Sequence, residues 1–121
     1  MFIKQAWILR LALHGTWIYS ESMTTLSNIA LSGMRAAQTS LDTSAHNIAN
    51  LGTEGFHRQQ VVQQEAPGGG VNTQIKRAET AGESLEEDVV AQLQAKNAFL
   101  ANLKVFKTAS KMAGTLLDEK G

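Results

Sequence analysis

Two segments near the ends of this 121-residue chain carry apolar side chains three and four positions apart, the spacing of one face of an α-helix. The first helix is predicted to begin after Thr24 or Thr25 as the N-cap, and to end near Asn50, where a glycine-containing turn follows. Its small seam residues would let a second helix approach closely. The seam residues expected to pack against other helices are Leu26, Ile29, Gly33, Met34, Leu41 and Ile48.

The second helix is predicted to begin at Leu85, because Ser84 and Glu87 have the spacing of a capping box. Three consecutive carboxylates, at residues 86–88, fall in its first turn, where the helix dipole favours negative charge. The apolar positions form two seams, which implies more than one helical neighbour. The first seam is Phe99, Leu103, Phe106, Ser110, Ala113 and Leu117, and the second is Val90, Leu93 and Leu100.

The middle of the chain predicts a small β-hairpin. Residues 56–64 and 71–76 have the composition of short, mostly polar strands, and Pro67 with three following glycines predicts the turn between them. Residues 78–83 form a polar linker to the second helix. The predicted fold is therefore mainly α, with two long terminal helices packed as an elongated, coiled-coil-like pair and a small β-hairpin and loop between them.

Residues 1–22 are the most apolar part of the chain, and four interpretations of them remain open. A membrane-spanning helix is interrupted by Arg10 and His14, and a secretory signal has only a weak cleavage site at residues 20–22. Alternatively, Met23 is the natural start and residues 1–22 derive from an upstream start codon, or they form a real amphipathic extension. The predicted divisions are residues 1–22, 23–50, 51–84 and 85–121.

Composition and spacing argue against catalysis and against a cofactor or metal site. The chain has no cysteine, and its three histidines, His14, His46 and His57, lie in separate segments without a second ligand at helical or strand spacing. No nucleophile, base and orienting group can be assembled, so we expect no enzyme and no small-molecule substrate. Eleven basic and eleven acidic residues balance, and the stripe Lys104, Lys107 and Lys111 fits the negative end of a helix dipole better than a nucleic-acid site.

The two apolar stripes are longer than one small hairpin can cover. Packing of many copies side by side would bury them, and unlike contacts that do not close on themselves produce tubes or filaments. Self-assembly is therefore the expected function.

Both ends of the chain resemble the bacterial flagellar rod and hook proteins, specifically the small proximal-rod type. At the N-terminal side the resemblance rests on Ser-Asn-Ile-Ala-Leu-Ser-Gly-Met at 27–34 and on the run from Asn-Ile-Ala-Asn at 47–50 to Gly-Phe-His-Arg at 55–58. At the C-terminal side it rests on Leu-Glu-Glu at 85–87, Ala-Asn-Leu-Lys-Val at 101–105 and Leu-Leu at 116–117. The family motif loop is carried by Asn47, Ala49, Asn50, Thr53, Gly55 and Phe56.

The resemblance implies a structural subunit of the flagellar basal-body rod that supports motility. Its implied partners are other copies, further rod and hook axial proteins, and the flagellar type III export apparatus, with export that needs no cleaved signal peptide. His57 departs from the family pattern, which has Lys or Arg there, and residues 1–22 have no family counterpart. The alternative is a small helical adaptor or export-related binding protein held at the membrane through residues 1–22.

Overall fold

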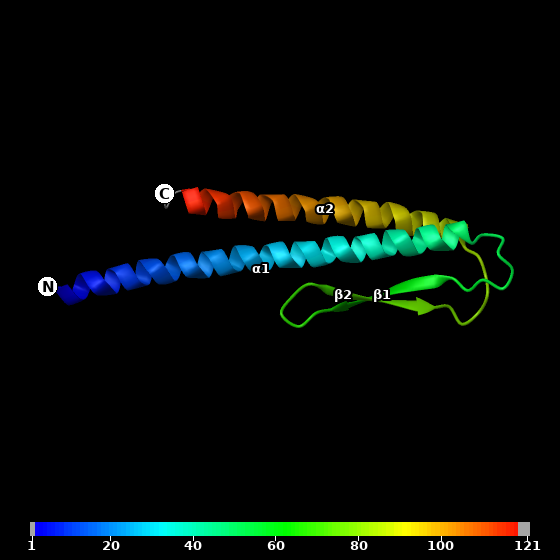
Figure 1. Ribbon diagram of the computed structural model, residues 1–121, viewed down its shortest axis with the longest axis horizontal. Helices are drawn as coiled ribbons and strands as arrows, with labels where there is room; N and C mark the ends of the chain where they lie inside the picture. Colours follow the sequence, from blue (N-terminus) through cyan, green and yellow to red (C-terminus); the bar gives the residue numbers. More distant parts are fainter. Residues whose placement is uncertain (1, 119–121) are drawn as a thin grey trace.

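The computed structural model describes the backbone of residues 2–118 and the side chains of residues 21–118. In chain order its elements are α1 (Phe2–Ala49), β1 (Gln59–Glu65), β2 (Val71–Arg77) and α2 (Leu85–Asp118). Figure 1 shows α1 lying between α2 and the β-hairpin, with the loop and linker gathered at one end of the helix pair. This arrangement confirms the predicted fold class.

The helix ends agree with the sequence analysis at two of three positions. The first helix ends at Ala49 and the second begins at Leu85, as expected. The predicted beginning at Thr24 or Thr25 is wrong, because helical backbone continues through both residues. No glycine or proline stands between Thr16 and Ser32, so a threonine with capping ability has nothing beside it that stops the helix. The four interpretations of residues 1–22 depend on side chains of residues 1–20, which lie outside those described, as do residues 119–121.

The face of α2 that meets α1 follows a heptad repeat. Asp88, Ala95 and Ala109 are buried and Asn102 is half-buried, each in step with the others at multiples of seven residues. Phe99, Leu103, Phe106 and Ala113 of the predicted seam are half-buried. Ser110 and Leu117 are exposed within the chain, so contact of this part of the seam with a further helix stays a prediction. Ala109, next to Ser110, faces α1. Its fully buried methyl group is small enough for the two helices to approach closely.

Two contacts fix the register of α1 against α2. The Asn47 amide donates to Asp88 over 3.0 Å, and a Cβ atom added to Gly33 would lie 2.6 Å from Oδ1 of Asn102. Fourteen residues separate the two contacts on each helix, so the antiparallel helices remain in step over two heptads. The predicted close approach at Gly33 is thus present, and its partner is an asparagine side chain.

The hairpin packs along α1. Its strands pair antiparallel from Gln59 opposite Arg77 to Glu65 opposite Val71. Near the turn, the backbone N–H of Val71 donates to Ser32 Oγ at 3.2 Å. A Cβ atom on Gly70 would lie 2.6 Å from the same Oγ, and Gly70 has φ of 92°, so glycine satisfies both the backbone conformation and the close approach. An isolated two-stranded hairpin is marginal in water, and α1 supplies the surface that this one lacks.

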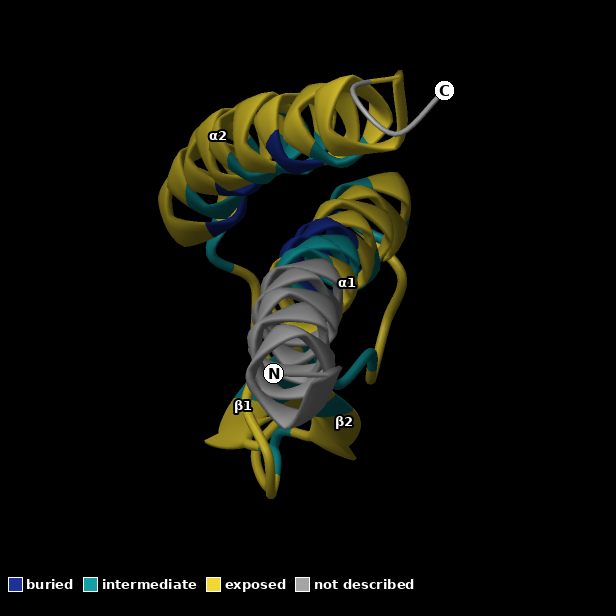
Figure 2. Cartoon of the chain, turned by 90° about the vertical axis from the view of Figure 1, so that its left-hand side faces the viewer, coloured by how far each residue is buried: buried dark blue, intermediate teal, exposed yellow. Residues whose placement is uncertain are grey.

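The core of the described chain is thin. Figure 2 shows the buried segments on the facing sides of α1 and α2, while the outer side of α2 is exposed along its length. The buried apolar residues are five alanines and one methionine, namely Ala30, Met34, Ala36, Ala37, Ala95 and Ala109. Larger apolar side chains are mostly outside this seam. Small residues therefore hold the helices together within one chain, and the larger apolar area remains exposed.

Candidate functional site

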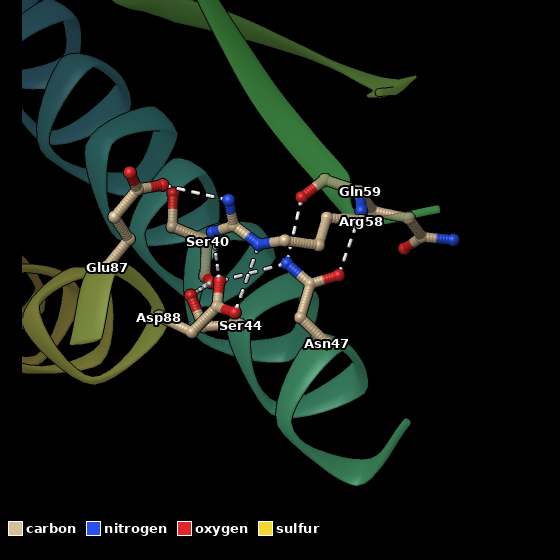
Figure 3. Close-up of polar contacts among 7 residues, drawn as sticks. All are labelled: Ser40, Ser44, Asn47, Arg58, Gln59, Glu87 and Asp88. Carbon is tan, nitrogen blue, oxygen red and sulfur yellow. Dashed lines mark hydrogen bonds and ion pairs between the residues drawn. The ribbon is translucent and has the colours of Figure 1, made fainter. Parts of the chain in front are cut away.

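Arg58, between the loop and β1, forms a buried ion pair with the first turn of α2. Its Nη2 and Nε atoms donate to the two carboxylate oxygens of Asp88, at 2.8 and 3.3 Å, and its Nη1 donates to Glu87 at 2.8 Å (Figure 3). The Asp88 side chain is 4% exposed and that of Arg58 16%, whereas that of Glu87 is 71% exposed. Asp88 is therefore the structural partner of Arg58, and Glu87 is a solvated second one.

Asn47, in the last turn of α1, completes the cluster. Its Nδ2 donates to Asp88 and, at 2.9 Å, to the backbone carbonyl of Gln59, and its Oδ1 accepts from the Gln59 N–H at 2.8 Å. One buried amide thus holds the beginning of β1 and the beginning of α2 against the end of α1. We refer to Asn47, Arg58, Gln59, Glu87 and Asp88 as the junction.

The electrostatics of the junction favour a permanent ion pair. The hydrogen bonds that Arg58 donates to Asp88 raise the pKa of the Arg58 guanidinium above its ordinary value, against the opposing effect of burial, and Glu87 adds to the rise. Among residues 21–118, no buried side-chain nitrogen or oxygen lacks a hydrogen-bond partner. The Asp88 carboxylate accepts hydrogen bonds from both Arg58 and Asn47. This arrangement holds three elements together.

The motif loop turns the chain immediately after α1. Asn50 Nδ2 donates to the His46 carbonyl at 2.8 Å, and the Asn50 carbonyl accepts from the Thr53 N–H at 3.0 Å. Gly55 has φ of 71°, a conformation that glycine adopts at little cost. The Phe56 ring lies 5.6 Å from the His46 ring, at an angle of 58°. Asn50 thus caps the end of α1, and Phe56 packs against His46 of that helix. Ala49, Thr53 and Gly55 of the loop are exposed.

The linker from β2 to α2 follows the motif loop closely. The Ala78 N–H donates to the Arg58 carbonyl at 2.8 Å, and the Gly82 N–H donates to the Phe56 carbonyl at 3.3 Å. The Glu83 carboxylate accepts from the Gly52 N–H at 2.5 Å. Loop, linker and junction thus form one hydrogen-bonded cap at the end of the helix pair.

The residues expected to mediate assembly fall into two groups. Met34 is buried, and Gly33, Ile48, Phe99, Leu103 and Phe106 lie partly buried within the chain. The others remain exposed, namely Leu26, Ile29, Leu41, Leu93 and Leu117. The second group is 37–71% exposed and therefore offers more apolar surface to another molecule than the first.

An apolar groove runs between α1 and α2, on the side away from the hairpin. It encloses about 510 Å³, and its apolar walls are formed by Ala37, Leu41, Val89, Leu93, Phe99 and Leu100. Gln38 and Asp42 of α1 and Gln92 and Lys96 of α2 also line it. We refer to it as the outer groove. Its leucines are between 40% and 59% exposed, so the groove is open to solvent.

Sequence reasoning missed the junction as a unit. The sequence places Arg58 after the family loop, Glu87 in a capping box and Asp88 at the helix dipole, and no local pattern joins the three residues. Glu87 contacts Arg58, and within residues 21–118 no side-chain hydrogen bond between Ser84 and Glu87 is formed. The available signal is the heptad position of Asp88, seven residues before Ala95, which places this carboxylate on the inward face.

The part of the chain with described side chains offers no metal centre: no three His, Asp or Glu residues gather there in a way that could hold an ion. His57 Nδ1 lies 2.9 Å from the Ala78 carbonyl, and His46 contacts Phe56. Within that same part, neither helix combines the length and apolarity needed to cross a membrane. Lys104, Lys107 and Lys111 are exposed along α2.

Comparison with known proteins gives one family match. Residues 28–57, from the apolar face of α1 through the motif loop, match the family described as flagella basal body rod protein. No curated protein matches the chain. The matched stretch contains Asn47 of the junction and the whole motif loop, and it ends one residue before Arg58. The match therefore supports the flagellar rod protein family for this chain, and with it a structural role in the flagellar basal-body rod.

Proposed function

We propose that this protein is a self-assembling structural subunit of the bacterial flagellar rod, which packs through α1 and α2 and supports flagellum-dependent motility. The partners under this proposal are further copies and other rod and hook axial proteins, and the route to the rod is the flagellar type III export apparatus without a cleaved signal peptide. The family match at residues 28–57 supports the location.

The observation that carries the self-assembly proposal is the distribution of apolar surface. Within residues 21–118 the buried apolar side chains are mostly alanines, while four leucines of α2, at positions 85, 93, 100 and 117, are 47–71% exposed. Such exposure does not stabilise a monomer, because apolar surface contributes about 25 cal/mol per Å² only when it is removed from water. Burial between subunits accounts for both the thin core and the exposed leucines.

The first test is a peptide mass spectrum of purified basal bodies, with attention to the N-terminal peptide of the protein. Its presence there supports the rod assignment, and a mature start at Met23 would identify residues 1–22 as upstream of the natural protein. Absence from basal bodies, with the intact N-terminus found at the inner membrane, would refute the rod proposal in favour of the membrane adaptor.

The second test uses motility. Leu93→Asp alters a side chain that is 59% exposed, so it should leave the monomer folded while it abolishes assembly and swimming. Leu103→Asp and Phe106→Asp are poorer probes, because both side chains are partly buried within the chain and their loss would damage the fold. Gln74→Asp, on an exposed hairpin position, is the control. Normal motility with Leu93→Asp would contradict assembly through the helices.

A further inference from the structure

The backbone groups of β1 alternate in direction along the strand. At its two ends, the Arg58 carbonyl accepts from the Ala78 N–H at 2.8 Å, and the Ala66 N–H donates to the Gly70 carbonyl at 3.0 Å. Residues with even numbers in this stretch therefore turn their N–H and C=O groups towards β2. Those with odd numbers turn the same groups towards the outer edge of the strand.

The odd-numbered residues differ in what they meet at this outer edge. Both backbone groups of Gln59 are held by the Asn47 side-chain amide, at 2.8 and 2.9 Å (Figure 3). This amide stands where the peptide group of a neighbouring strand would stand. The next two odd-numbered residues are Val61 and Gln63, and no side chain or loop among residues 21–118 is hydrogen-bonded to their backbone groups. Beyond Asn47, this edge of the sheet is therefore open.

A groove runs along the open edge, between β1 and α2, with α1 as its floor. It consists of two adjoining hollows, one of about 240 Å³ at Val61 and one of about 340 Å³ at Gln63. Ser40 of α1 and Ala91 of α2 line both hollows and mark where they meet. Other small residues of the two helices also line it, among them Gly33, Ala36, Thr43, Ser44 and Ala98. We refer to it as the edge groove.

We propose that the edge groove binds an extended segment of another polypeptide, which joins β1 as the third strand of an antiparallel sheet. Strand addition of this kind uses the free N–H and C=O groups of an edge strand for affinity and the adjoining pockets for specificity. The added strand would lie about 4.8 Å from β1, over the flank of α1. This binding does not depend on the rod assignment, and it uses neither the outer groove nor the exposed leucines of α2.

The edge groove also determines which side chains the segment can carry. Residues opposite Val61 and Gln63 direct their N–H groups to β1 and place their side chains on the same face as those two residues, which line the groove. The small residues of the floor leave room for alanine, serine or glycine there. The residues between them point to the other face and are unrestricted. At the junction end, Glu87 and Asp88 outnumber Arg58, and the Glu87 side chain is 71% exposed, so a basic residue fits at that end.

Short synthetic peptides test this binding with the full chain. The probe is Ala-Thr-Ser-Thr-Ala-Thr-Lys, which has small residues at alternate positions and, in antiparallel pairing, its lysine at the junction. Hydrogen exchange of backbone amides is followed by nuclear magnetic resonance. In the free chain, the Val61 and Gln63 amides should exchange faster than those of Val62 and Gln64, which are paired with β2. Probe at millimolar concentration should slow the exchange of Val61 and Gln63 selectively.

Matched changes in the probe separate strand pairing from unspecific contact. N-methylation of the serine and of the alanine that follows the second threonine removes N–H groups that face β1. It should weaken binding by about tenfold or more. N-methylation of the threonines on either side of the serine removes N–H groups that face away from β1, and should leave the affinity unchanged.

Matched changes in the chain locate the binding. Ala91→Leu fills the border between the two hollows and should abolish the effect of the probe. Ala98→Leu, at an exposed position of the larger hollow, should weaken binding without disturbing the fold. Asn97→Leu, at an exposed position outside the groove, is the control and should bind normally. Circular dichroism shows whether each variant is folded.

Three outcomes would overturn the proposal. Val61 and Gln63 amides that are already protected in the dilute free chain would mean that the edge is not open. Equal effects of N-methylation at both sets of positions would mean that the peptide binds without joining the sheet. No binding at millimolar probe, or binding that Ala91→Leu and Ala98→Leu both leave intact, would mean that the edge groove takes no such segment.

Discussion

The three consecutive carboxylates at the beginning of α2 allow the junction to be tested against the helix dipole. All three lie in the first turn and gain equally from the dipole, but Asp88 alone is buried, and it accepts two hydrogen bonds from Arg58 and one from Asn47. Asp88→Asn keeps the size of the side chain and removes its charge. We expect it to lower the free energy of unfolding far more than Glu87→Gln or Glu86→Gln.

The magnitude follows from burial. Loss of one partner of a buried ion pair costs roughly 3–5 kcal/mol, and Arg58 keeps Glu87 and some solvent contact, so about 3 kcal/mol is expected for Asp88→Asn. Glu87→Gln breaks a pair whose acid is 71% exposed and should cost about 0–1 kcal/mol. Glu86→Gln loses only the dipole interaction, about 0.3–1 kcal/mol. A domain is commonly stable by about 5–15 kcal/mol, so the difference is large.

The assay is unfolding in urea, monitored by circular dichroism. The three variants should share one slope of unfolding free energy against urea concentration. Because the pKa of Arg58 is raised, the stability from its charge is fully present below the ordinary guanidinium pKa and is lost only as the pH rises through the raised value. Measurements at neutral pH thus report the whole effect. Equal losses for the three variants would refute the reasoning and leave the dipole as the sole role of these carboxylates.

Two further predictions concern the helix seam and the motif loop. Ala109→Leu should destabilise the chain by about 1–3 kcal/mol, because Ala109 is fully buried. Ser110→Leu, on an exposed neighbour, should change stability by about 0.5 kcal/mol or less in the same assay; the opposite order would mean that the heptad register is wrong. Gly55→Ala should cost about 1–2 kcal/mol because Gly55 has φ of 71°. Gly82→Ala, at a glycine without positive φ and with open space around it, should cost less, and a smaller loss at Gly55 than at Gly82 would contradict the role of the backbone angle.

Local periodicity was sufficient to predict the elements and their order. The 3.6-residue pattern gives both helices, and glycine and proline give the hairpin turn. The predicted helix beginning at Thr24 is wrong, because a residue that can cap a helix interrupts one only when its neighbours also disfavour helical backbone. The same pattern did not single out Ala109, because the predicted seam is counted from Phe99 and Phe106 and passes beside the row of Asp88, Ala95 and Ala109 that the structure buries.

The junction was beyond local reasoning for a different physical reason. Arg58 and Asp88 are thirty residues apart, and both are charged residues of types usually found at the surface. Nothing in the neighbourhood of either residue shows that the two are buried together. The contact arises only when the hairpin returns the chain to the end of α1 and places the first turn of α2 beside Asn47. Long-range pairs of this kind are determined by the fold and not by the spacing along the chain.

The two helix-to-helix contacts are equally spaced on α1 and α2, so few insertions or deletions in the helices are compatible with both contacts. Deleting one residue between Gly33 and Asn47 would rotate one contact by about 100° relative to the other, so that either the glycine or the amide would lose its partner on α2. Only matched insertions or deletions of seven residues in both helices would preserve both contacts, and each would alter the helix pair by about 10 Å. Relatives of different length are therefore expected to differ in whole heptads, with their two helices lengthened together.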